Sequence, residues 1–333
     1  MLSSLSQSHL SLLATCPRKF QHLYLDRVMP PQSWHQNQRA LWGTQFHQLM
    51  QQLELGLPID RLRETQPDLF LGIEALRSAA PQLFQAPNPA QGEWQASEHR
   101  RSLAFSPPAA HDKATDPMGL LVVYDWIRGN PEFVEIFDWK TYRQPPQSQK
   151  LAQHWQTRLY CYVLAETSDY QPQHIRFSYW FVAPPQAGEP VQARSLSFQY
   201  NQALHDQTHQ DLCDLIQNFQ DWVTAYQTES VQFPQVPEGD RACQFCGFQQ
   251  RCQRVSGGEE GQDWQQRREQ EPDKGWTQDL TQDLTQDWAQ NSQSVELLDG
   301  QSLQAQQQLQ ELLHIAEIPA LPWPWEESSS ARL

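Results

Sequence analysis

Apolar and polar positions alternate most clearly in residues 119–141, which read GLLVVYDWIRGNPEFVEIFDWKT. Two runs rich in β-branched and aromatic residues flank residues 128–131, a cluster of turn formers, and this pattern predicts a β-hairpin. Side chains two positions apart on a strand share a face, so Asp138 and Lys140 point the same way. The turn then places Asp125 opposite or diagonal to Asp138.

The rest of the first 255 residues mixes the two periodicities of secondary structure. Strand patterns occupy residues 93–105, 175–182 and 191–200, and helical patterns occupy residues 3–25, 60–85, 150–166 and 204–226. Pro17 is expected to start a second helical segment, because its missing N–H is harmless in a first turn. Strands interleaved with helices predict the α/β class.

The C-terminal part of the chain differs from the rest in composition. Residues 255–333 carry 15 acidic and 4 basic residues, so they account for −11 of the net charge of −15 and leave −4 for the remainder. We expect a domain at 1–255, a polar low-complexity linker at 256–291 and a C-terminal helix with a flexible tail at 292–333. The chain has neither a long apolar run nor a signal-peptide pattern, which predicts a soluble, cytoplasmic protein without membrane contact.

Two carboxylates on one patch of an apolar hairpin repel each other unless a cation lies between them. Asp125, Asp138 and the ammonium of Lys140 therefore indicate a site for a hard divalent metal ion. The alternative is an edge hairpin that carries a surface ion pair.

Cysteines form a second candidate metal site. Cys243, Cys246 and Cys252 follow a C-x2-C-x5-C spacing, which in an intracellular protein favours metal ligation over disulfides. Cys16, in the sequence Cys-Pro-Arg-Lys-Phe, is the candidate for a fourth ligand. The two remaining cysteines lie in helical patterns, where burial explains them: Cys161 and Cys213.

An acid followed by Asp-x-Lys at the end of the next strand resembles the PD-(D/E)XK nuclease superfamily. One cysteine before this hairpin and three after it resemble the iron-sulfur branch of RecB-like nucleases, which includes AddB-type subunits and CRISPR-associated exonucleases. This resemblance implies a restriction-endonuclease-like core, a central mixed sheet flanked by helices. It also implies a four-cysteine [4Fe-4S] cluster joining the two ends of the domain, with Zn²⁺ as the alternative.

Further motifs of the family match single positions. Gly43 and His47 have the Gly-x-x-x-His spacing, so the resemblance implies that His47 is a third ligand of Mg²⁺ or Mn²⁺; an imidazole favours Mn²⁺. Gln156 and Tyr160 match Q-x-x-x-Y, which implies polar groups that line a DNA channel. Glu98 lies where relatives often have an acid, and a solvated strand charge is the alternative reading.

In this interpretation, Asp125, Asp138 and His47 hold the metal while Lys140 orients the attacking water. The expected activity is that of a metal-dependent deoxyribonuclease, an exonuclease acting on single strands or ends, in DNA repair or recombination. A helicase partner is left open. The alternative is a non-catalytic nucleic-acid-binding or partner subunit of a helicase-nuclease complex.

Overall fold

A computed structural model describes residues 3–28, 34–108, 117–143, 148–185, 190–244 and 246–254. All of them belong to one compact unit, Met1–Asp287. The predicted linker at 256–291 and the predicted helix and tail at 292–333 lie outside the described residues. Among the described helices, none combines the length and apolar character needed to cross a membrane.

A six-stranded mixed sheet forms the centre of the domain. The strands are β1 (Ser4–Leu5), β2 (Trp94–Phe105), β3 (Met118–Gly129), β4 (Val134–Lys140), β5 (Ile175–Val182) and β6 (Ala193–Gln199). Their order is β1-β3-β4-β5-β6, and β2 pairs with β3 off this path. Two pairs are parallel, β1 with β3 and β4 with β5, and the others are antiparallel. The strands predicted from residue patterns are confirmed, and the class is α/β with a mixed sheet flanked by helices.

The predicted hairpin is β3 and β4. Its ladder runs from Gly129↔Val134 to Trp126↔Phe137. The side-chain oxygen of Asn130 accepts the backbone N–H groups of residues 132 and 133, which closes the turn. Asn tolerates this local bonding to its own backbone, so the turn lies where the cluster of turn formers indicated.

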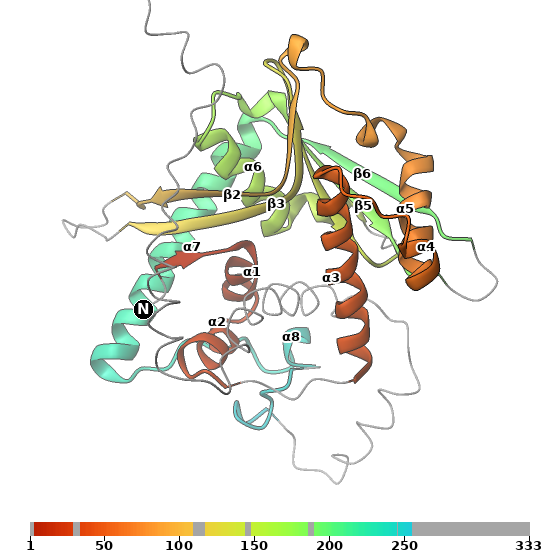
Figure 1. Cartoon of the computed structure of the whole chain (residues 1–333). Coiled ribbons are helices and arrows are strands. Elements are labelled where there is room, and N and C mark those ends of the chain that lie inside the picture. Colours follow the sequence, from red (N-terminus) through yellow and green to blue (C-terminus); the bar gives the residue numbers. More distant parts are fainter. Residues whose placement is uncertain are drawn as a thin grey trace, which may run out of the picture. The chain divides into compact units, whose positions relative to one another are not determined.

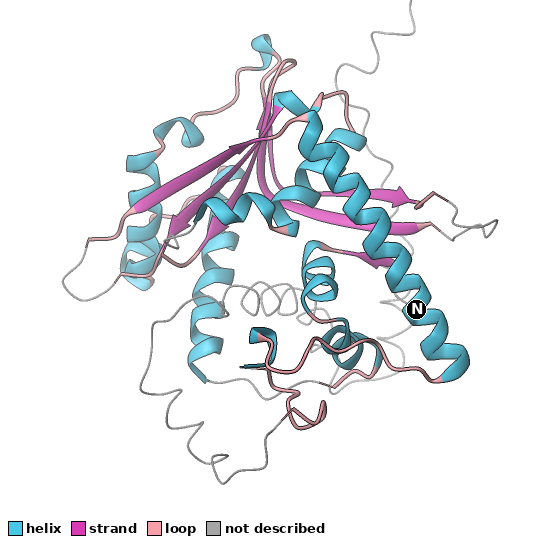
Figure 2. Cartoon of the chain, turned by 180° about the vertical axis from the view of Figure 1, so that it is seen from behind, coloured by secondary structure: helices cyan, strands magenta, loops and turns pink. Residues whose placement is uncertain are grey.

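Helices cover both faces of the sheet, as Figures 1 and 2 show from opposite sides. α3 (Trp34–Glu54) and α5 (Pro67–Ala79) pack against one face with Trp126, Phe137 and Trp139. α1 (Gln7–Thr15), α6 (Trp155–Glu166) and α7 (Gln202–Glu229) pack against the other face. Residues of β4 alternate between the two cores, so Trp139 faces α3 while its neighbours Asp138 and Lys140 face α6.

Proline explains where the helices depart from the sequence pattern. The helix expected at 60–85 is divided into α4 (Leu62–Thr65), α5 and a 3-10 turn at Pro81–Phe84. Pro67 and Pro81 each stand at the first position of a new segment, where the missing N–H costs no hydrogen bond. The remaining segments are α2 (Pro17–Phe20), a π-helical turn (Gln21–Leu25), α8 (Arg241–Gln244) and 3-10 turns at Pro89–Gln91, Ser148–Gln153 and Pro172–His174.

The first residues join the sheet before the helix begins. Residues 3–25 were expected to be helical from the start, but β1 pairs with β3, and the backbone N–H of Gly119 donates to the carbonyl of Ser3 at 3.0 Å. A Cβ atom on Gly119 would lie 3.0 Å from that carbonyl oxygen. The glycine therefore allows β1 to approach, and Pro17 starts α2 as predicted.

Candidate metal and active site

A break in the β2–β3 ladder marks the centre of the site. Backbone pairs flank it at Ser97↔Trp126 and His99↔Tyr124, but Glu98 and Asp125 between them form no ladder pair. Glu98 has a φ of 47°, the left-handed region that a side chain with a Cβ rarely adopts. Both strands bend along their length in Figure 1. Strained residues of this kind cluster at functional sites, where surrounding structure holds them in place.

Helix α3 brings His47 to this break. Its Nε2 donates to the backbone carbonyl of Trp139 at 3.0 Å, and its Nδ1 lies 3.4 Å from Asp125 Oδ1. The other oxygen of Asp125 accepts the backbone N–H of Trp139 at 2.8 Å. The end of β4 therefore fixes both side chains, so His47 and Asp125 meet, as the sequence motifs predicted.

Three donor atoms gather at this point. One ligand atom from each of His47, Glu98 and Asp125 lies within 4.8 Å of the other two. An imidazole with two carboxylates is a donor set suited to Mn²⁺ and, less well, to Mg²⁺. The three residues therefore form a candidate divalent-metal site.

Burial and the charges of their neighbours shift the pKa values of all three side chains. Burial lowers the pKa of His47, but the charge and hydrogen bond of Asp125 and the charges of Asp138 and Glu98 together outweigh burial and raise the pKa to about 9. Burial and the charge of Asp125 raise the pKa of Glu98 to about 7. Burial also opposes ionisation of Asp125, yet His47 and the N–H of Trp139 hold its pKa below its usual value. A dication in the group would replace the imidazole proton as the positive partner of the two acids.

Asp138 and Lys140 lie next to this group, on the α6 side of β4. Lys140 Nζ is 3.2 Å from Asp138 Oδ2, and both side chains are less than 7% exposed. Gln156 connects them: its Nε2 donates to Asp138 Oδ1 at 2.5 Å, and its Oε1 accepts from Lys140 at 2.8 Å. Asp138 is outside the three-residue donor group, although its charge contributes to the raised pKa of His47.

Gln156 and Tyr160, the two residues of the Q-x-x-x-Y motif, are both buried in the domain. Gln156 is 7% exposed and is bonded to both charged residues, while the ring of Tyr160 packs edge-on against Tyr124 in the core. Arg158, also on α6, is buried and pairs with Asp211 at 2.5 Å. These side chains are held inside the domain, and Gln156 contacts the site through its hydrogen bonds to Asp138 and Lys140.

Sequence reasoning left the role of Glu98 open, and the tertiary structure places it in the candidate donor group with His47 and Asp125. Its strand was predicted, and so was the hairpin with Asp125, but nothing in the pattern indicated that β2 and β3 pair in the register that sets these two acids opposite each other. An acid in the middle of a strand next to another acidic strand is the signal that was available.

The four cysteines of the second candidate site line one pocket: Cys16, Cys243, Cys246 and Cys252. Burial first, and then the neighbouring thiols, raise the pKa of Cys243 and of Cys252. Cys161 and Cys213 are buried in helices, as expected. Hydrogen bonds between the start of the chain and residues 232–234 hold the two ends together, among them Arg18 Nε to the carbonyl of Phe233 at 2.6 Å.

A comparison with protein families gives a match over most of the chain. A family model described as the PD-(D/E)XK nuclease superfamily matches residues 4–253, a range that includes both candidate sites. A solved structure titled "Crystal structure of SSO0001" is similar over 77% of this chain and 89% of that chain, with 9% sequence identity and a TM-score of 0.33. The search among curated proteins finds no match.

Proposed function

Because the chain belongs to the PD-(D/E)XK nuclease superfamily, we propose that it is a metal-dependent DNA nuclease that cleaves single strands or free ends. The observation that carries this proposal is the meeting of His47, Glu98 and Asp125 beside a buried, oriented Lys140. DNA repair or recombination in the cytoplasm is the setting that we propose. A helicase partner remains a prediction of the resemblance alone.

His47, Glu98 and Asp125 would hold a Mg²⁺ or Mn²⁺ ion, with Asp138 proposed as a further donor. When bound, such an ion polarises the scissile phosphate and lowers the pKa of a bound water. The other contributions to catalysis come from residues of the protein. Lys140, held by Asp138 and Gln156, supplies a fixed positive charge that orients the attacking water and offsets the charge developing on the phosphate.

A second group of cations supports a nucleic-acid partner. A pocket of about 440 Å³ near the cysteine pocket is lined by Arg18, Arg251 and Arg254 and contains one acid, Glu238. Arginine forks suit phosphate oxygens. A surplus of guanidinium groups in a chain of net charge −15 is therefore consistent with a local contact to a nucleic-acid backbone.

Because four cysteines line one pocket, we propose that a [4Fe-4S] cluster binds there and joins the two ends of the domain. The resemblance to the iron-sulfur branch of RecB-like nucleases favours this cluster over a tetrahedral zinc ion held by the same four thiolates.

The test of nuclease activity uses end-labelled single-stranded and double-stranded DNA with Mg²⁺ or Mn²⁺. Asp125→Asn and Lys140→Met are each expected to lower the cleavage rate at least about 100-fold, because each removes a group that acts at the reacting phosphate. Asp68→Asn, an exposed acid on α5, is the matched control and keeps full activity. Wild-type rates in both site variants would overturn the proposal, and DNA binding without cleavage would favour the non-catalytic subunit.

The cluster is tested separately by anaerobic purification. Brown protein with broad visible absorption and about four iron atoms per chain is the expected result. Colourless protein with one zinc ion would replace the cluster by zinc and leave the nuclease proposal intact.

A further inference from the structure

A buried histidine beside the cysteine pocket has no part in the proposed cleavage reaction. His22 is 3% exposed and lies in the π-helical turn Gln21–Leu25, which follows α2 directly. π-helical turns are rare and occur frequently at functional sites. Burying an imidazole is costly unless its polar atoms are bonded, so the contacts of this ring indicate why it is present.

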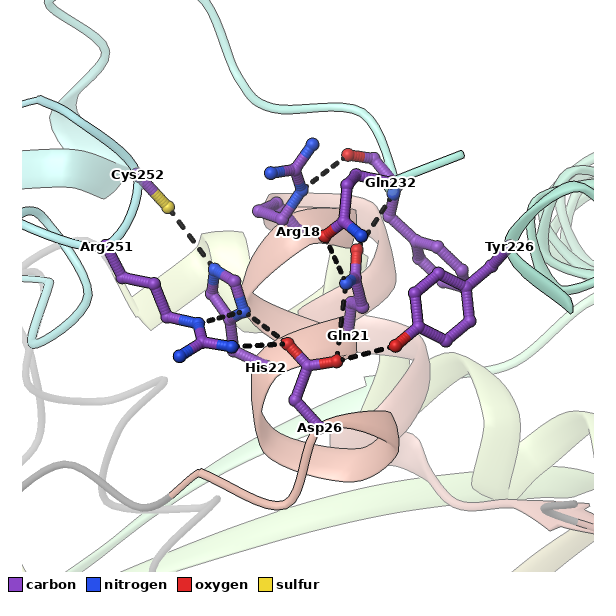
Figure 3. A network of polar contacts seen from close by, with 9 residues as sticks. Arg18, Gln21, His22, Asp26, Tyr226, Gln232, Arg251 and Cys252 are labelled. Atoms are coloured by element: carbon purple, nitrogen blue, oxygen red, sulfur yellow. Dashed lines mark hydrogen bonds and ion pairs between the residues drawn. The ribbon is translucent and has the colours of Figure 1, made fainter. Parts of the chain in front are cut away.

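The ring of His22 reaches from this turn to the cysteine loop, as Figure 3 shows. Its Nε2 lies 3.6 Å from Cys252 Sγ, and its Nδ1 lies 2.9 Å from Asp26 Oδ2. Asp26 lies four positions after His22, so the two side chains share one side of the turn. The sulfur, the ring and the carboxylate therefore form a continuous row.

Asp26 is itself held by residues from separate parts of the chain. Tyr226, near the end of α7, donates its hydroxyl to Asp26 Oδ1 at 2.9 Å, and Arg251 donates to Oδ2 at 3.3 Å. Arg251 is next to Cys252, so the same loop that carries the sulfur also bonds the carboxylate. These bonds restrict the rotation of the acid and, through it, the orientation of the imidazole.

Histidines that ligate a metal commonly donate their other ring N–H to a carboxylate, which fixes the orientation of the ring, and the Asp26 carboxylate can fix the ring of His22 in the same way. A metal-bound thiolate is a hydrogen-bond acceptor, and hydrogen bonds to the sulfur ligands are among the determinants of the reduction potential of an iron-sulfur cluster. An apolar side chain could equally well pack on Phe248, whose ring centroid is 5.1 Å from that of His22. Packing alone therefore does not account for a histidine backed by an acid.

We propose that His22 is a positioning residue of the cysteine-bound metal centre and that both of its ring nitrogens carry a proton: Nδ1–H donates to Asp26, which fixes the ring, and Nε2–H donates to the sulfur of Cys252. This inference rests on the proposed metal centre and goes beyond it, because it assigns a role to two residues that are not ligands. The bond orients the thiolate toward the pocket and stabilises the more negative, reduced form of the cluster.

The test compares His22→Phe, which keeps a ring but has no donor, with His22→Gln, whose amide retains an N–H. We measure the midpoint potential of the cluster and the rate of iron release to a chelator, with circular dichroism as a check of folding. His22→Phe is expected to shift the potential to more negative values and to release iron several-fold faster. His22→Gln is expected to restore both quantities at least in part, as a purely space-filling role would not.

His209→Gln is the matched control, because His209 also bonds a neighbour, the hydroxyl of Tyr162 at 2.7 Å, but is not among the residues that line the cysteine pocket. Should His22→Phe fail to fold, Asp26→Asn leaves the ring in place and is expected to shift the potential in the same direction. Loaded variants with wild-type potential and iron release overturn the role of His22 alone. Wild-type protein that holds no iron overturns this inference together with the proposed cluster.

Discussion

Gln156 offers the sharpest test of how the site is held together, because one neutral amide connects two buried charges. Its N–H donates to Asp138 and its carbonyl accepts from Lys140. Replacing Gln156 by leucine keeps a similar volume but removes both hydrogen bonds. Of the three interactions, only the direct Asp138–Lys140 ion pair at 3.2 Å is then left.

The magnitude follows from these contacts. Hydrogen bonds to charged groups contribute about 1.5–3 kcal/mol each, so two of them give ~3–6 kcal/mol for Gln156→Leu. The surviving ion pair reduces the loss, and we expect about 3 kcal/mol. For a domain of this size 1 kcal/mol shifts Tm by about 2–4 °C, so Tm should fall by ~6–12 °C. Displacement of Lys140 should lower kcat about 100-fold, the effect typical of a misplaced group.

Thermal melts and single-turnover DNA cleavage provide the measurements. Gln210→Leu is the control, since Gln210 donates to Asp214 at 3.0 Å on the exposed side of α7 and should cost no more than about 0.5 kcal/mol. Gln156→Glu adds a second comparison, because only its protonated form can both donate to Asp138 and accept from Lys140. Its activity relative to wild type should rise as the pH falls. Wild-type Tm and kcat in Gln156→Leu would refute this account of the site.

Three further predictions concern other parts of the molecule. The raised pKa of His47, about 9, contributes stability below pH 6.5 that is lost as the pH rises through 9. The free energy of unfolding of metal-free protein should therefore fall by on the order of 3 kcal/mol over this range, as measured by denaturant titration. Saturating Mn²⁺ should abolish this loss. Arg18→Gln should weaken binding of single-stranded DNA by a similar factor for all sequences and reduce the salt slope by about 1; an unchanged slope in fluorescence anisotropy would contradict a phosphate contact. Gly119→Val would set a Cβ 3.0 Å from the carbonyl of Ser3, so loss of the β1–β3 pairing should destabilise the domain by about 1–3 kcal/mol, with Gly129 and β4 unaffected in hydrogen exchange.

Local patterns were sufficient for most of the secondary structure. The period-two alternation of residues 119–141 and the turn formers between the two runs predicted β3 and β4, because strand faces and turn geometry depend on near neighbours in sequence. Helices were less exact. The segment at 60–85 contains Pro67 and Pro81, and each proline starts a new segment where the apolar pattern alone predicted one continuous helix.

The sequence by itself determined the chemical inventory: an acid and an Asp-x-Lys on one hairpin, a histidine on a helix, and four cysteines near the ends of the domain. Tertiary structure decided which of these groups meet. Glu98 joins His47 and Asp125 because β2 pairs with β3 in one register, and Gln156 holds Asp138 and Lys140 because α6 packs on that face of β4. Side-chain types and local periodicity are written along the chain, whereas contacts between distant segments depend on the packing of the whole domain.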